Sequence, residues 1–172
     1  MNRPELLSPA GDMNKLLTAL HFGADAVYFA GKNFGLRAYA TNFSDREIFE
    51  AVKVCHDAGK KAYVTVNIFA SDRDFGALKD YLFLLEKAGV DGVIASDPGV
   101  AALVKKTTKL PLHISTQANV TNRYAAGFWR DFGAERIVLA RELSLSEIAG
   151  INEYLAGTCQ TEVFVHGAMC IS

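Results

Sequence analysis

The sequence predicts an α/β fold of the TIM-type (β/α) barrel class, with the N-terminal seven strands present and the C-terminal end incomplete. Short apolar runs rich in β-branched residues alternate with longer stretches of helical period, which indicates a parallel sheet. A glycine, a polar residue and an apolar run also recur together at 23–29, 89–95 and 133–139. The chain has neither a G-x-G-x-x-G after its first strand nor a Walker-type Gly-Lys-Ser/Thr, which favours the barrel over an open doubly wound sheet.

Seven strands are predicted at 5–7, 26–29, 62–66, 92–95, 112–115, 136–139 and 162–165. Helix starts between them are marked by side chains that accept hydrogen bonds from the free N–H groups of a first turn. Ser44 with Glu47, and Ser144 with Glu147, fit the capping box, and Asp97 precedes a proline at the first helical position. These residues predict where three of the helices begin.

The helix expected after the fifth strand carries three aromatic residues, Tyr124, Phe128 and Phe132, at intervals of four. Residues at that spacing share one face of a helix. We therefore expect the three rings to pack against the sheet as core, rather than to hold a cofactor.

Composition limits the class of protein. Half of the 172 residues are hydrophobic and the formal net charge is −1, which suits a globular domain and predicts no bulk attraction to nucleic acid or an anionic membrane. No apolar run approaches the ~18 residues that span a bilayer, so we expect a cytoplasmic protein without a membrane partner. We expect residues 1–172 to form a single barrel domain. A complete barrel has eight strands and about 250 residues, so an open seam is expected, through which the chain self-associates.

Candidate site residues are the polar side chains that follow the strands, since a barrel builds its active site at the carboxyl ends of its strands. Arg141 stands at a strand end, where a guanidinium can bind a carboxylate or phosphate through two parallel hydrogen bonds. Arg37 lies in a long loop, and Gln117 and Asn119 stand at alternate positions past a strand. The predicted binding residues for a small anionic molecule are Arg37, Asn67, Gln117, Asn119, Arg141 and Glu142.

Several polar residues that follow the predicted strands have an alternative interpretation, in which their role is structural and they bind no ligand. Asp12 and Asp97 are most simply helix N-caps. The run 115–119 is alternatively a polar loop that satisfies its own backbone, and Arg141 with Glu142 is alternatively a surface ion pair.

The three cysteines, Cys55, Cys159 and Cys170, are too few and too widely spaced for a disulfide framework. Cys55 falls among apolar residues of a helix, which predicts a small buried side chain. Cys170 follows His166 just past the last predicted strand, so the two are the candidate catalytic pair, with His166 as the base. A metal or iron–sulfur site is the other interpretation of Cys170, and it requires further cysteines that the neighbouring sequence does not supply.

Six motifs in order along the chain resemble the peptidase U32 family of collagenase-like proteins. They are PELLSPAG (4–11), GADAVY (23–28), SDPG (96–99), STQAN (115–119), RELS (141–144) and EVFVHGAMC (162–170). Within the family, the chain is most similar to the branch that forms 5-hydroxyuridine in tRNA with prephenate in place of dioxygen. The chain ends where the cysteine signature of the family begins.

The resemblance implies an iron–sulfur enzyme. Members of the hydroxylating branches carry a [4Fe–4S] cluster on four cysteines, and Cys170 matches the first of them. The cluster is therefore expected in the full-length protein and not in residues 1–172 alone, which we expect to be inactive. The resemblance also implies prephenate as a co-substrate and tRNA as a partner. The alternative activity is that of a U32 peptidase, although the chain has neither a Ser-His-Asp set nor an HExxH motif. A third interpretation is a non-catalytic barrel that binds a small molecule.

Overall fold

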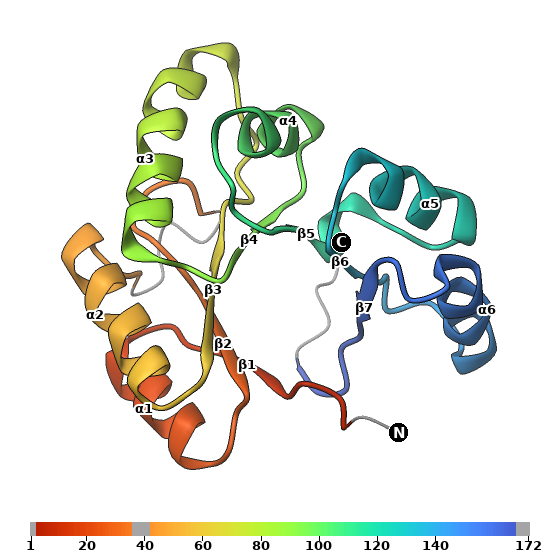
Figure 1. Cartoon of the computed structure of the whole chain (residues 1–172), viewed down its shortest axis with the longest axis horizontal. Helices are drawn as coiled ribbons and strands as arrows, with labels where there is room; N and C mark the ends of the chain where they lie inside the picture. Colours follow the sequence, from red (N-terminus) through yellow and green to blue (C-terminus); the bar gives the residue numbers. More distant parts are fainter. Residues whose placement is uncertain (1–2, 36–41, 168–172) are drawn as a thin grey trace. The chain divides into compact units, whose positions relative to one another are not determined.

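The computed structural model describes residues 3–35 and 42–167, which divide into two compact units, residues 1–112 and 113–172. In the first unit, strands β1 (Leu7–Pro9), β2 (Ala26–Ala30), β3 (Lys61–Thr65) and β4 (Gly92–Ala95) pair in parallel and in chain order. The strands alternate with helices α1 (Met13–His21), α2 (Asp45–Asp57), α3 (Phe75–Ala88) and α4 (Pro98–Thr107), as Figure 1 shows. The short 3₁₀ helix η1 (Asp72–Asp74) leads into α3.

The second unit repeats the same pattern. Strand β5 (Leu112–Ile114) begins on the last residue of the first unit and is followed by the 3₁₀ helix η2 (Thr116–Ala118) and helix α5 (Arg123–Phe132). Strands β6 (Arg136–Val138) and β7 (Gln160–Glu162) enclose helix α6 (Leu145–Leu155) in the sequence, and β5, β6 and β7 pair in parallel and in chain order. Parallel strands in chain order joined by helices are the β/α units that the sequence predicts. The single domain over residues 1–172 stays a prediction.

The predicted helix starts are confirmed. Ser44 Oγ accepts a hydrogen bond from the Glu47 N–H (3.4 Å), while the Glu47 carboxylate accepts one from the Ser44 N–H (2.7 Å). Ser144 makes the same capping box at the start of α6. Asp12 and Asp97 cap α1 and α4 through their side chains, so the structural interpretation of these two aspartates is correct.

Strands β1 to β4 of the first unit bury side chains on both of their faces, because successive side chains of a strand point to opposite faces. Val27, Phe29, Val64 and Val93 are buried on one face, as expected for strands that are covered by helices. Residues of the other parity form a second apolar cluster, which consists of Leu7, Ala26, Tyr28, Tyr63 and Ile94. The sheet is therefore buried on both faces.

The first and last strands differ from the predicted ranges. The sequence predicts strands at 5–7 and 162–165, whereas β1 pairs from Leu7 and β7 pairs from Gln160. Ahead of β1, the Leu6 carbonyl accepts from the Asp25 N–H (2.8 Å), outside the regular ladder. Past β7, the apolar run that suggested a strand is exposed, with Val165 86% exposed. In both places, strand pairing and not local apolarity decides the boundary.

The prediction that Tyr124, Phe128 and Phe132 pack against the sheet is wrong for Tyr124 and Phe128, whereas Phe132 is half-buried. Tyr124 is 69% exposed and Phe128 is 59% exposed. The buried face of α5 instead consists of Ala126, Gly127 and Trp129. A side chain at Gly127 would lie 2.9 Å from the Tyr154 ring of α6, so the small face of α5 is the one that allows the two helices to approach closely.

Candidate functional site

The carboxyl ends of β5, β6 and β7 are tied together within the second unit. Thr116 Oγ1, just past β5, donates to the Leu139 carbonyl at the end of β6 (3.4 Å). The Leu139 N–H donates in turn to the Glu162 carbonyl of β7 (2.9 Å). Four of the predicted binding residues follow β5 and β6 at this end of the strands: Gln117, Asn119, Arg141 and Glu142. The second unit thus brings them to one rim, where a barrel fold places its binding groups.

The segment after β5 is a tight turn and not an extended strand. Ser115 caps η2, its hydroxyl accepting from the Gln117 N–H (3.3 Å), and Asn119 ends the turn in the left-handed conformation at φ 52°. The alternation expected of an extended strand therefore does not set the side-chain directions. Gln117 and Asn119 are nevertheless exposed, so the turn presents two amide side chains to solvent.

Arg141 is half-buried against an aromatic ring. Its guanidinium carbon lies 4.1 Å from the centre of the Phe164 ring, which belongs to the segment just past β7. A cation over a ring face at this distance is attracted by the negative face of the ring. Glu142 is exposed beside it. Sequence reasoning singled out Arg141 and missed Phe164, because the ring was interpreted as part of a strand.

The remaining predicted binding residues belong to the first unit. Asn67 is half-buried two residues past β3. Arg37 lies outside the described residues; of the residues on either side of that part of the chain, Gly31 and Phe43 form a parallel bridge. The Phe29 and Phe43 rings pack with their centres 4.5 Å apart.

The predicted burial of Cys55 is confirmed. Cys55 is buried in α2, and burial followed by the nearby Asp91 carboxylate raises the pKa of its thiol to about 11. Cys159 is also buried, which raises its pKa, so both thiols are protonated and unreactive at neutral pH. His166 is exposed, and Cys170 lies outside the described residues. Among residues 3–35 and 42–167, no three His, Cys, Asp or Glu side chains are grouped so that they could hold a metal ion.

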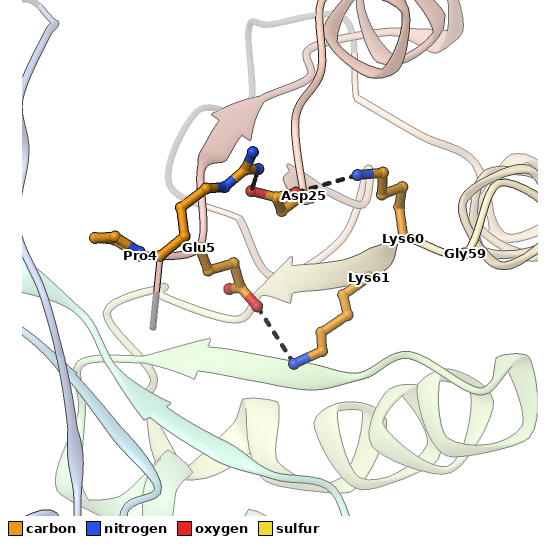
Figure 2. A pocket seen from close by; sticks show the side chains of 7 residues that line it. Pro4, Glu5, Asp25, Gly59, Lys60 and Lys61 are labelled. Carbon is orange, nitrogen blue, oxygen red and sulfur yellow. Dashed lines mark hydrogen bonds and ion pairs between the residues drawn. The ribbon is translucent and has the colours of Figure 1, made fainter. Parts of the chain in front are cut away.

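A pocket of about 530 Å³ lies at the opposite, amino-terminal ends of β1, β2 and β3 (Figure 2). Asp25 is one of the residues that line it, and its carboxylate accepts from the Leu6 N–H (3.0 Å) and pairs with Arg3 and Lys60. The Leu6 N–H, followed by Arg3 and then Lys60, holds the pKa of Asp25 well below its usual value. Residues at the amino-terminal end of a barrel contribute to stability and not to catalysis, so we infer that these ion pairs stabilise the packing of the strands.

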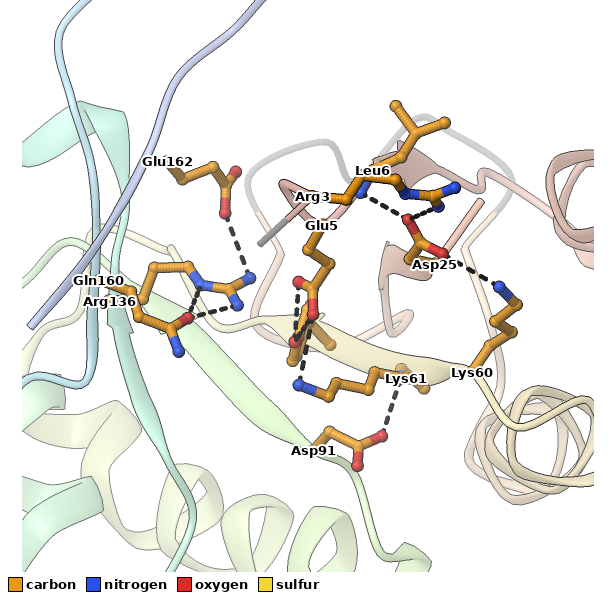
Figure 3. Close-up of polar contacts among 12 residues, drawn as sticks. Arg3, Glu5, Leu6, Asp25, Lys60, Lys61, Asp91, Arg136, Gln160 and Glu162 are labelled. Atoms are coloured by element: carbon orange, nitrogen blue, oxygen red, sulfur yellow. Dashed lines mark hydrogen bonds and ion pairs between the residues drawn. The ribbon is translucent and has the colours of Figure 1, made fainter. Parts of the chain in front are cut away.

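A second polar cluster, which sequence reasoning missed, fixes β7 to β6 (Figure 3). The Arg136 guanidinium donates to Gln160 Oε1 from Nε (3.1 Å) and from Nη2 (2.7 Å), and Glu162 Oε2 lies 3.7 Å from Nη1. The Arg136 side chain is only 8% exposed. Thr161 points the other way and donates to Asn152 of α6 (2.6 Å). Strand β7 has no buried apolar side chain, so these polar contacts anchor it.

No helix in the described part of the chain is long and apolar enough to cross a membrane.

Comparisons with known proteins agree with the resemblance. The sequence model of peptidase family U32 matches residues 11–172. The tRNA hydroxylation protein P1 of Bacillus subtilis (strain 168) is 43% identical over 99% of this chain and 40% of its own length. The uncharacterized protease MJ0090 of Methanocaldococcus jannaschii is 42% identical over 98% of this chain and 42% of its own length. The chain thus spans about two fifths of the length of these curated relatives.

The comparison with solved structures concerns the fold. The U32 peptidase Mk0906 matches with a TM-score of 0.75 at 20% identity, over 94% of this chain and 67% of that chain. At this level of identity the likeness shows the architecture alone. The predicted TIM-type barrel class, with seven parallel strands, is confirmed.

Proposed function

Because the chain belongs to peptidase family U32, we propose that it is the barrel portion of an enzyme that hydroxylates uridine in tRNA. The observation that carries the proposal is the 43% identity, across nearly the whole chain, with a protein named for tRNA hydroxylation. Fold likeness alone would not support an activity, since one barrel fold hosts many chemistries. The proposal places the reaction in the cytoplasm, with tRNA as the macromolecular partner of the whole protein.

The proposed co-substrate is prephenate, a small molecule with two carboxylates. Arg141 would bind one carboxylate through its parallel N–H groups, and the exposed amides of Gln117 and Asn119 would donate to the same molecule. Their common position at the carboxyl ends of β5 and β6 supports this assignment. Arg37, Asn67 and Glu142 remain candidates for the rest of the pocket.

The proposed cofactor is a [4Fe–4S] cluster of the whole protein. The described residues do not fit it by themselves, because the thiols of Cys55 and Cys159 are buried and their pKa values are raised. Cluster ligands must be thiolates, so neither residue is suited to bind iron. Cys170 is the one remaining cysteine of the chain and would be a single ligand among four. We therefore assign to this chain no step that passes through the cluster.

Peptidase activity is the second candidate, because a relative of 42% identity is named as a protease. Its catalytic groups would be Cys170 and His166. His166 is exposed, four residues before Cys170. A nucleophilic cysteine needs a base held within hydrogen-bond reach. Hydrolysis of collagen peptides by the purified parent, lost in Cys170→Ala and in His166→Ala, would favour this candidate over hydroxylation.

The test of the main proposal is anaerobic iron and sulfide analysis of the full-length parent, with a visible spectrum, beside its Cys170→Ala variant. A brown parent with about four irons per chain, lost in the variant, is the expected result. A colourless and iron-free parent would refute the iron–sulfur hydroxylase and leave the peptidase or a non-catalytic binding barrel.

We also propose that residues 1–172 self-associate through the open edge of the sheet. Val163 (41% exposed) and Val165 (86% exposed) follow β7 and support this contact. Light scattering coupled to size-exclusion chromatography should give a mass above 18.7 kDa, and a monomer at all concentrations would contradict the proposal.

A further inference from the structure

The contact between Arg141 and Phe164 differs from the other cation–aromatic contacts of the described residues. Its distance of 4.1 Å is the shortest, compared with 5.2 Å for Arg123 over Tyr124 and 5.3 Å for Arg130 over Tyr154. Those pairs lie on the surfaces of α5 and α6. The Arg141 pair instead joins the segments that follow two strands, β6 and β7, at the rim where a barrel fold binds its substrates.

A guanidinium this close to a ring centre lies over the ring face. In general, a guanidinium that stacks on a ring keeps its N–H donors directed outward in its own plane. That plane is the one in which a carboxylate accepts two parallel hydrogen bonds. A long arginine side chain also carries about 2 kcal/mol of rotamer entropy, part of which binding would otherwise have to remove. A ring that fixes the guanidinium beforehand reduces this loss.

We propose that Phe164 is a positioning residue that holds the Arg141 guanidinium ready to bind a carboxylate of the substrate. The inference rests on the proposed anion site and adds the residue that orients it. Phe164 is 37% exposed, so its ring is accessible from the rim and is not simply a part of the core. The proposal predicts that lysine would bind the carboxylate more weakly at position 141, since an ammonium neither stacks as a plane nor donates in parallel.

The first test is calorimetric titration of prephenate into the chain and its variants. Phe164→Leu should weaken the Kd by about 2- to 5-fold, which corresponds to about 0.5–1 kcal/mol of lost cation–π attraction. Phe164→Tyr keeps a ring face and should restore the affinity. Phe83→Leu is the matched control, because Phe83 is 43% exposed and faces Lys79 at 5.7 Å, yet lies on α3 in the first unit. It should leave the Kd unchanged.

A double-mutant cycle separates positioning from a general structural effect. In an Arg141→Lys background, where affinity is already lower, Phe164→Leu should weaken the Kd no further. Equal effects of Phe164→Leu in both backgrounds would overturn the proposal. So would a Kd for Phe164→Leu that equals the parent value while Arg141→Lys binds more weakly.

A second measurement does not depend on prephenate. In ¹H–¹⁵N spectra of the arginine Nε–H groups, Arg141 should be shifted upfield by the Phe164 ring current, and Phe164→Leu should remove that shift. If the shift is present but prephenate does not bind, the positioning stands and the proposed co-substrate is wrong. If the shift is absent in the parent chain, the positioning itself is refuted.

Discussion

Replacing Arg136 by methionine is expected to destabilise the protein by about 3 kcal/mol. The guanidinium makes two hydrogen bonds to Gln160 Oε1 (3.1 and 2.7 Å) and lies 3.7 Å from Glu162 Oε2. Hydrogen bonds that involve a charged group contribute roughly 1.5–3 kcal/mol, and removing one partner of a buried ion pair costs roughly 3–5 kcal/mol. The Glu162 Oε2 atom that faces Arg136 is buried, but the side chain as a whole keeps 19% of its exposure, so the lower part of the combined range applies.

Urea denaturation followed by circular dichroism measures this loss, provided that the m-value is unchanged. Native-state hydrogen exchange should show that the amides of β7 lose most protection, because Arg136 is the main anchor of that strand. Adding Glu162→Gln to Arg136→Met should recover part of the stability, since no uncompensated carboxylate then remains. Lys53→Met is the control: Lys53 pairs with Asp57 on the surface of α2, its side chain is 73% exposed, and the change should matter far less. A loss below about 1 kcal/mol for Arg136→Met would refute the assignment of Arg136 as the anchor.

Three further predictions concern the fold. Gly31→Ala should destabilise the protein by roughly 1–3 kcal/mol in urea denaturation, because the added Cβ would collide with the Tyr81 hydroxyl. Tyr81→Phe should recover part of this loss in the double variant. Equal losses in the parent and in the Tyr81→Phe background would contradict the collision. Trp129→Ala should cost about 3–5 kcal/mol while Phe128→Ala should cost less than about 1 kcal/mol, and the reverse order would mean that α5 is rotated. Asp25 has a lowered pKa in the folded state, so its stabilisation is present above pH about 4 and is lost as the pH falls toward the folded value. Asp25→Asn should therefore flatten the acid limb of the stability curve between pH about 4 and 2, and an unchanged limb would argue against the Leu6, Arg3 and Lys60 contacts.

Local signals in the sequence predicted most of the fold. The capping boxes at Ser44 and Ser144, and the caps at Asp12 and Asp97, depend on residues three positions apart, so the sequence alone determines them. Strand β4 was predicted with its observed bounds because it is a short apolar run between a glycine-ended helix and a helix cap. Local features were predicted where a capping side chain marked them, whereas the tight turn after β5 and the Asn122 cap of α5 were not.

Features that depend on distant partners were not predicted. The aromatic period of α5 identifies a face but not the face that is buried, because that choice depends on how closely Gly127 lets α6 approach. Arg136 gave no signal, since a charged residue at the start of a strand is usually exposed, and its partners on β7 lie 24 or more residues away. Phe164 was hidden in an apolar run whose pairing ends at Glu162. At the candidate site, the sequence pointed to Arg141 but not to the Phe164 ring beside it.

The most direct test of the central claim is the 5-hydroxyuridine content of tRNA. Cells that lack the parent gene would receive either the full-length parent or its Cys170→Ala variant, expressed at equal levels, and their tRNA nucleosides would be analysed by mass spectrometry. The account predicts that 5-hydroxyuridine is restored by the parent and not by the variant. Equal amounts of the modified nucleoside with the parent, with the variant and with neither would contradict it.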